Sequence, residues 1–223
     1  MDLIQILAQG NTFFRLMTGF SVTLYISLLT ALFSVIIGLA LGFVMNSKNT
    51  VLKIFSKVYL EFFRLLPQLV LLFVFYYGIT SALGWDLDAQ TSAIIVFTFW
   101  ASAEMGDLIR SAIQNVSKEQ IEAGKAVGLS KFAVARHIII PNVIRTVIPQ
   151  TVNLLTRIIK TSAIVPLIGV MDITKVGQAV IDLNRFKYPD GAFWIYLFIF
   201  VLYFVACYFL SLLSRLFEKK LMN

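Results

Sequence analysis

Five stretches of this sequence are long and apolar enough to cross a lipid bilayer, and they constrain the fold more than any other feature. A bilayer core takes about 20 apolar residues in a helix. With 59% hydrophobic and only 14% charged residues, the chain is also too apolar for a soluble globular domain. We therefore expect an all-α, polytopic membrane protein with one transmembrane domain over residues 1–223. The expected spans are residues 20–45, 58–79, 91–112, 147–170 and 192–213.

The charges between the spans predict the orientation. Residues 46–57 carry three lysines and no acid, which indicates a cytoplasmic loop under the positive-inside rule. Residues 84–90 carry two aspartates and no basic residue, as suits the outer face, and residues 171–191 are expected to form a second outer loop. Five spans then place the N-terminus outside and the C-terminus in the cytoplasm.

The ends and the glycines add local expectations. Residues 1–19 are mildly amphipathic and lack a basic start or a cleavage site, so we expect a helix at the outer interface rather than a removable signal peptide. Gly38 and Gly42 form a small face that permits close helix contact. Pro67 is expected to kink the second span.

Polar residues inside the third and fourth spans are the candidate substrate ligands. Charges inside a membrane are costly, so they usually face a cavity or a partner. On the third span Glu104 and Asp107 are three residues apart and share one face. On the fourth span Asn153, Arg157 and Lys160 share a face at spacings of four and three.

Two interpretations of these charges stay open. In the first, the two faces line a water-filled path in which Glu104 receives an ammonium group and Arg157 a carboxylate. In the second, Glu104 or Asp107 pairs with Arg157, Lys160 or Arg110 only to make helix packing tolerable. The second interpretation is favoured for Asp107 and Arg110, which lie near the inner end of the span.

The sequence offers little for catalysis. It contains no Gly-x-x-x-x-Gly-Lys-Ser/Thr loop, so ATP must be hydrolysed by another chain. No nucleophile motif or metal cluster is expected, because His137 is the single histidine and Cys207 the single cysteine. The net charge of +7 is accounted for by the inner loops and does not indicate nucleic-acid binding.

The most polar helical segment lies between the third and fourth spans. From Glu122 to Val127, apolar residues recur at helical spacing, and Glu122 and Lys125 form a polar face. Gly128 is expected to end this helix, and Ser130 can cap a second one. Two short helices joined at a glycine would form a basic hairpin that a partner protein can bind.

This hairpin resembles the cytoplasmic signature of the permease subunits of ATP-binding-cassette importers. That signature is Glu-Ala-Ala, three residues, Gly, nine residues, Ile, any residue, Leu-Pro. The spacing is kept in full here, with Gly124 in place of the second Ala and Ile140 in place of Leu. The resemblance implies the type I importer permease fold, with a cytoplasmic coupling helix within residues 113–145. It implies ATPase-coupling contacts within residues 122–141, at Glu122, Ala123, Gly124, Ala126, Gly128 and Pro141.

Other segments are similar to the polar-amino-acid branch of these permeases. The run from Ala103 to Arg110 is similar to the branch's Ala-Tyr-x-Ala-Glu-x-x-Arg, with Glu104 for Tyr and Asp107 for Glu. Asn153 and Lys160 also match an Asn and Lys of the branch. Some basic-amino-acid permeases have an acid directly after that Asn, where this chain has leucine.

The resemblance implies a permease subunit of an ATP-driven amino-acid importer in a bacterial plasma (inner) membrane. Implied partners are two ATPase subunits that bind ATP and Mg, a second permease chain, identical or homologous, and an extracytoplasmic substrate-binding protein. No cofactor is expected in this chain itself. The alternative is an ATP-independent channel or secondary transporter, which is disfavoured because the sequence shows no inverted repeat.

Overall fold

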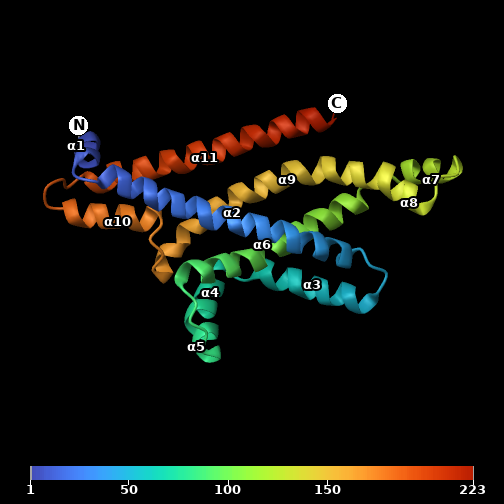
Figure 1. Cartoon of the computed structure of the whole chain (residues 1–223), viewed down its shortest axis with the longest axis horizontal. Helices are drawn as coiled ribbons and strands as arrows, with labels where there is room; N and C mark the ends of the chain where they lie inside the picture. Colours follow the sequence, from blue (N-terminus) through green and yellow to red (C-terminus); the bar gives the residue numbers. More distant parts are fainter. Residues whose placement is uncertain (1, 223) are drawn as a thin grey trace. The chain divides into compact units, whose positions relative to one another are not determined.

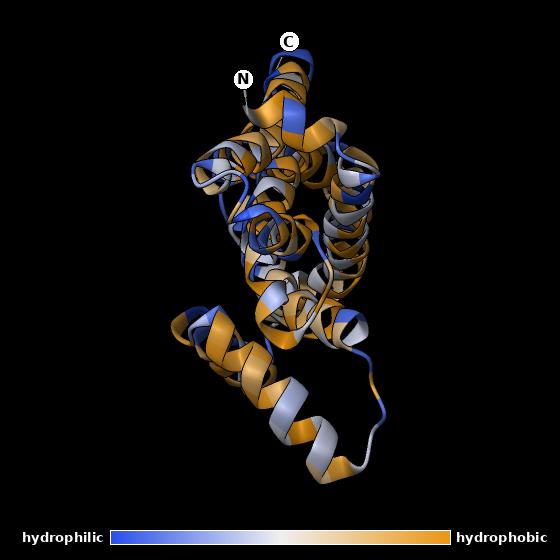
Figure 2. Ribbon diagram, turned by 90° about the vertical axis from the view of Figure 1, so that its left-hand side faces the viewer, coloured by the Kyte–Doolittle hydropathy of each residue, from blue (hydrophilic) through white to orange (hydrophobic). Residues whose placement is uncertain are grey.

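The structure is a computed structural model that describes residues 2–222, with side chains from residue 3 to residue 220. Every regular element in this range is helical, so the predicted all-α class is confirmed. Apolar residues dominate most of these helices (Figure 2). The chain divides into two compact units: unit 1 comprises Met1–Thr30, Pro67–Phe97 and Thr156–Phe209, and unit 2 comprises Ala31–Leu66, Thr98–Leu155 and Leu210–Asn223.

Within the described residues, four helical stretches are long and apolar enough to cross a membrane. A broken pair of helices supplies a fifth span when it is counted as one, in agreement with the five predicted spans. The four stretches are α2 (Thr12–Met45), α6 (Ala89–Gln114), the run Lys131–Ile168, and α11 (Gly191–Met222). The run Lys131–Ile168 joins α8 (Lys131–Val134), η2 (Ala135–Ile139), α9 (Ile140–Thr161) and η3 (Ser162–Ile168).

The second predicted span is interrupted at Pro67. A residue that precedes proline is pushed out of the helical region, and Leu66 is extended with φ −80° and ψ 136°. Helix α3 (Thr50–Leu65) ends there, and the chain resumes as α4 (Gln68–Phe73), η1 (Val74–Ile79) and α5 (Thr80–Leu83). The predicted kink is therefore a complete break, and residues 58–79 do not form one continuous helix.

Two predicted segment boundaries are wrong, and one predicted loop contains a helix. Residues 50–57, expected in a loop, form the first half of α3, because Asn49 caps it by accepting the Val51 N–H at 2.9 Å. Residues 12–19, expected in an interfacial segment, belong to α2, and only α1 (Asp2–Ala8) is separate. The outer loop expected over residues 171–191 contains α10 (Ile173–Asn184).

In unit 1, α10 packs beside the first turns of α2 (Figure 1). A Cβ added at Gly19 would lie 2.9 Å from the Ile173 Cα, so the two backbones approach closely. Asp172 caps α10 by accepting the Lys175 N–H at 2.9 Å. The helix then buries one apolar face in a core whose members come from four helices: Ile6, Leu16, Ile173, Val176, Val180, Ile195 and Ile199.

In unit 2, the second half of α2 packs against α6 through its two glycines. A Cβ at Gly38 would lie 2.5 Å from the Met105 Cβ, and one at Gly42 would lie 2.6 Å from the Ile109 Cγ2. Real Cβ atoms do not approach this closely, so the contact depends on glycine at both positions. The predicted small-residue face is confirmed.

Candidate functional site

The acidic residues of the predicted site lie on one face of α6 and are largely enclosed. The Glu104 side chain is 15% exposed and the Asp107 side chain 18% exposed. Both side chains face α3 within unit 2, since each forms an ion pair with Arg64 of that helix. Charges in such surroundings need compensation by opposite charge or by hydrogen bonds.

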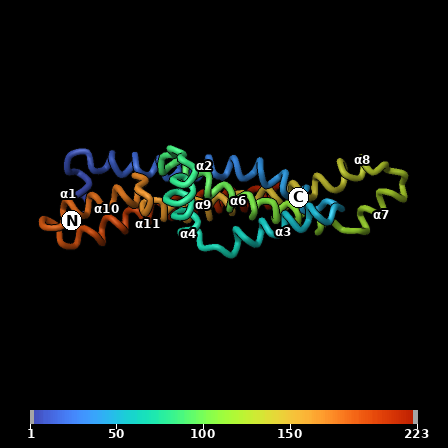
Figure 3. Tube along the Cα trace, turned by 90° about the horizontal axis from the view of Figure 1, so that it is seen from below, coloured from blue at the N-terminus to red at the C-terminus, as the bar shows by residue number. Residues whose placement is uncertain are grey.

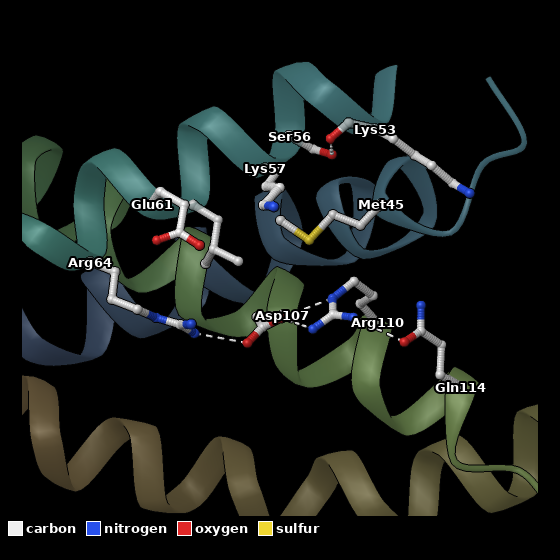
Figure 4. Close-up of a pocket in the computed structure, with 10 residues that line it drawn as sticks. Met45, Lys53, Ser56, Lys57, Glu61, Arg64, Asp107, Arg110 and Gln114 are labelled. Carbon is white, nitrogen blue, oxygen red and sulfur yellow. Dashed lines mark hydrogen bonds and ion pairs between the residues drawn. The ribbon is translucent and has the colours of Figure 1, made fainter. Parts of the chain in front are cut away.

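Asp107 is the centre of an ion-pair network (Figure 4). Its Oδ2 accepts from Arg64 Nη2 at 2.8 Å, and its Oδ1 accepts from Arg110 Nη2 at 2.6 Å. Arg110 also donates from Nη1 to Gln114 Oε1 at 2.9 Å. Both carboxylate oxygens of Asp107 are thus engaged, as the structural interpretation of Asp107 and Arg110 expected.

Arg64 is the member of this network that the sequence did not assign to the candidate site. In the structure its Nε also lies 3.8 Å from Glu104 Oε1, so one guanidinium serves both acids of α6. Residues 64 and 107 are far apart in sequence, and no local pattern signals such a pair.

The basic side of the predicted site lies on α9. Asn153, Arg157 and Lys160 recur at spacings of four and three residues, and all three are exposed on the single chain. They form a polar stripe about 10 Å long, since a helix rises about 1.5 Å per residue. Their helix lies inside the apolar run Lys131–Ile168.

The predicted pairing of Glu104 with Arg157 through a substrate joins two different units. Glu104 and Asn153 belong to unit 2, whereas Arg157 and Lys160 belong to unit 1. Arg157 and Glu104 each have interactions of their own within the structure. The joint role of the two residues stays a prediction.

The predicted coupling hairpin is present in unit 2. Helix α7 (Lys118–Ala126) begins at Ser117, whose side chain accepts the Gln120 N–H, and α8 begins at Ser130, whose side chain accepts the Ala133 N–H at 3.2 Å. Figure 3 shows α7 and α8 side by side, joined by a short connection. Two helices joined at a glycine, with Ser130 as the cap of the second, are confirmed.

Gly128 ends α7 in a left-handed backbone conformation. Its φ is +87°, which a side chain disfavours. The Gly128 N–H bonds to the Lys125 carbonyl at 3.0 Å, and the Leu129 N–H bonds to the Gly124 carbonyl at 3.1 Å. These two bonds define a Schellman motif. The prediction that Gly128 adopts a conformation suited to glycine is confirmed.

The signature residues divide between the inside and the outside of the hairpin. Gly124 is buried, and a Cβ there would lie 2.6 Å from the Ile138 Cδ1, so its lack of a side chain lets α7 approach η2. Glu122, Ala123 and Ala126 are exposed. Two large apolar residues of the hairpin are exposed as well: Val127 at 78% and Phe132 at 72%. Pro141 lies in the first turn of α9.

One further acid lies outside the predicted spans and outside the predicted site. Asp172 is fully buried at the start of α10. Burial raises the pKa of the Asp172 carboxyl to about 6, although the backbone N–H of Lys175 donates to it. Among the described residues, no three His, Cys, Asp or Glu side chains lie together in a way that could hold a metal ion.

Membrane-crossing helices, charged residues within them and an exposed helical hairpin together define an integral membrane transport component. The chain belongs to the family of binding-protein-dependent transport system inner membrane components, whose model matches residues 34–223. This membership confirms the resemblance found in the hairpin and identifies the chain as a transport subunit rather than an enzyme. It also makes the chain a multi-pass membrane protein.

Individual relatives agree with the family. A probable amino-acid permease protein, YxeN, of Bacillus subtilis is 33% identical over 211 residues, which cover 94% of this chain and 92% of YxeN. A putative glutamine transport system permease protein, GlnP, of Rickettsia conorii is 29% identical over 208 residues, which cover 93% of each chain.

Solved structures share the fold. A crystal structure of an amino acid ABC transporter with histidines has a TM-score of 0.85 and 29% identity, over 92% of this chain and 94% of that chain. The MetNI methionine ABC transporter has a TM-score of 0.75 at 17% identity and supports the fold alone. The predicted importer permease fold is therefore confirmed.

Proposed function

We propose that this chain is the permease subunit of an ATP-driven importer of amino acids. Relatives named as glutamine and amino-acid permeases, and a solved amino acid transporter of the same fold, support the substrate class. The family's dependence on a binding protein supports a substrate-binding protein on the outer face.

The observation that carries this proposal is the exposed polar stripe on α9. Asn153, Arg157 and Lys160 face outward from a helix that lies in a membrane-crossing run. Charged side chains are not left against lipid, so this face borders water or another chain. A stripe of one amide and two cations suits the carboxylate and polar groups of an amino acid.

A second permease chain, identical or homologous, completes the path. The three side chains of the α9 stripe are exposed on one chain, and Lys160 also lines a cavity with Phe200 and Phe204 of α11. A partner placed against the stripe would enclose it. Glu104 then supplies the acid for the substrate ammonium, with Arg157 as the ligand of the carboxylate. Lys160 and Asn153 complete the polar lining of this proposed site. Asp107, whose two oxygens are engaged by Arg64 and Arg110, supports it from the network behind Glu104.

The hairpin from Glu122 to Pro141 docks an ATPase subunit on the cytoplasmic side. The hairpin exposes both apolar surface, at Val127 and Phe132, and the acid Glu122, which is a composition suited to a groove of another protein. Each of two ATPase subunits binds ATP and Mg, and its closure is transmitted through one hairpin to the spans. The N-terminus then lies outside a bacterial plasma membrane and the C-terminus in the cytoplasm.

Glu104→Gln and Arg157→Gln test the substrate site. Each change removes a charge at nearly constant shape. We expect stability to be roughly kept, while substrate-stimulated ATPase activity falls or shifts toward ligands that lack the matching charged group. The measurements are thermal unfolding and transport in vesicles that contain the importer.

The same variants separate a ligand role from a packing role. A loss of insertion or thermal stability with unchanged substrate choice would identify both residues as structural. Co-purification with an ATPase subunit separates the importer from an ATP-independent channel or secondary transporter.

A further inference from the structure

Two hollows of different chemistry adjoin beside α7 in unit 2. The first, of about 460 Å³, lies between α7 and η2, and its lining is mainly apolar. The second, of about 390 Å³, lies between the end of α6, the start of α7 and the first turns of α9, and most of its lining side chains are polar. Gln120 and Asn142 line both hollows, and Asn142 Nδ2 donates to Gln120 Oε1 at 3.3 Å. The two hollows therefore share one wall.

The polar hollow carries one positive charge. Arg145 of α9 is the one charged side chain among the described residues that line it. Arg145 is exposed, and it forms no ion pair with any side chain of residues 3–220. Glu119 of α7 does not line the hollow, and its Oε2 accepts from Ser117 Oγ at 2.8 Å. The charge of Arg145 is therefore available to an anionic group of a partner.

The apolar hollow belongs to the exposed surface of the hairpin. Val127 lines it and is 78% exposed, and Gly124 lines it without a side chain. His137 is the one titratable side chain among its described lining residues. Exposed apolar surface with a polar rim is typical of a protein–protein interaction site. A free anion would occupy the polar hollow alone, so the pair of hollows favours a protein segment with an acid next to an apolar side chain.

We propose that the polar hollow receives an aspartate or glutamate side chain of the ATPase subunit, paired with Arg145, while an apolar side chain of the same segment fills the adjoining hollow. This inference rests on the proposed docking of the ATPase to the hairpin, and it adds a contact outside residues 122–141. A guanidinium suits a carboxylate because its planar donors can bind both oxygens at once. Gln120 and Asn142, joined by their hydrogen bond, separate the two contacts.

Titration of the ATPase subunit of the importer onto the permease in lipid nanodiscs tests this contact. Arg145→Gln is expected to weaken the affinity at least about thirtyfold, because it leaves the carboxylate of the ATPase without its partner. Arg145→Lys keeps the charge and is expected to lose less than about fivefold. Arg136→Gln is the matched control. It removes the same charged group from an exposed position of η2 that lines neither hollow, and is expected to weaken binding by less than about threefold.

Carbodiimide cross-linking identifies the group that Arg145 contacts. The amine introduced by Arg145→Lys is expected to form an amide with a carboxylate of the ATPase, and mass spectrometry locates the cross-link. A complex that forms without this cross-link would overturn the assignment, as would unchanged affinity in Arg145→Gln or an equal loss in Arg136→Gln. Failure of the unchanged permease to bind the ATPase would refute the proposed function together with this contact.

Discussion

Replacement of Gly128 by valine is expected to uncouple ATP hydrolysis from transport while the chain remains folded in the membrane. Gly128 holds the turn between α7 and α8 at φ +87°. A Cβ added there would meet no atom within 4 Å, so the cost is one of backbone conformation and not of collision. The turn alone should be perturbed.

The size of the effect follows from this conformation. A left-handed residue with a Cβ costs about 1–2 kcal/mol, and a β-branched residue costs more. At about 1.4 kcal/mol for each factor of ten, the native turn should be disfavoured at least about tenfold against other geometries. This conformational cost is small compared with the stability of the whole fold. It is large for a hairpin that must hold two helices in one arrangement.

Gly84→Val is a matched control for this strain. Gly84 also ends a helix in the left-handed region, with φ +65°, and a Cβ there would likewise meet nothing within 4 Å. It lies in unit 1, whereas the hairpin lies in unit 2. Its replacement should carry a similar local cost without uncoupling transport.

The assay compares ATPase activity and substrate uptake in vesicles for both variants. Gly128→Asn should recover part of the coupling, because asparagine tolerates the left-handed region better than valine. Uptake at the normal rate by Gly128→Val would refute the coupling role. Equal uncoupling by Gly84→Val would show that general destabilisation, and not the hairpin, is responsible.

Three further outcomes are expected from the packing and the charges. Gly42→Val should lower the free energy of unfolding by about 1–3 kcal/mol, because a Cβ there would lie 2.6 Å from an α6 side chain; Gly78→Val, with open space around it, should not. In a double-mutant cycle, Arg64→Gln and Asp107→Asn should show a coupling of about 1–2 kcal/mol, and additive effects would contradict the 2.8 Å pair. The pKa of Asp172 is raised from 3.8 to about 6 in the folded state, so the free energy of unfolding should fall by up to about 3 kcal/mol as the pH rises from about 3.8 through about 6. Thermal unfolding at several pH values measures this fall. Asp172→Asn keeps the helix cap and should remove the pH dependence.

The sequence predicted best those features that depend on neighbouring residues. The turn at Gly128 needs only a helix, a glycine and a following cap, and all three are local. The glycines of α2 could be recognised as a contact face because their spacing is helical. Their partner helix could not be identified, since nothing near Gly38 or Gly42 in the sequence specifies Met105 or Ile109.

Helix α10 shows what a charge-based interpretation missed. Residues 171–191 contain both acidic and basic side chains, and this mixture favoured an outer loop. The same stretch has Ile173, Val176 and Val180 at helical spacing after the cap Asp172, and that apolar face is buried in unit 1. Periodicity carried the correct signal, and the mixture of charges obscured it.

Pro67 connects a local signal to a long-range contact. Because α3 must end at Leu65, Arg64 lies in its last turn, where a cation also interacts favourably with the helix C-terminus. From that turn its guanidinium reaches both acids of α6, at 2.8 Å for Asp107 and 3.8 Å for Glu104. A continuous helix through Pro67 would place Arg64 in a helix interior without this terminal position. The proline therefore places the positive charge of Arg64 at the C-terminal end of α3. The sequence around Pro67 does not indicate that Glu104 and Asp107 are the acids that Arg64 contacts.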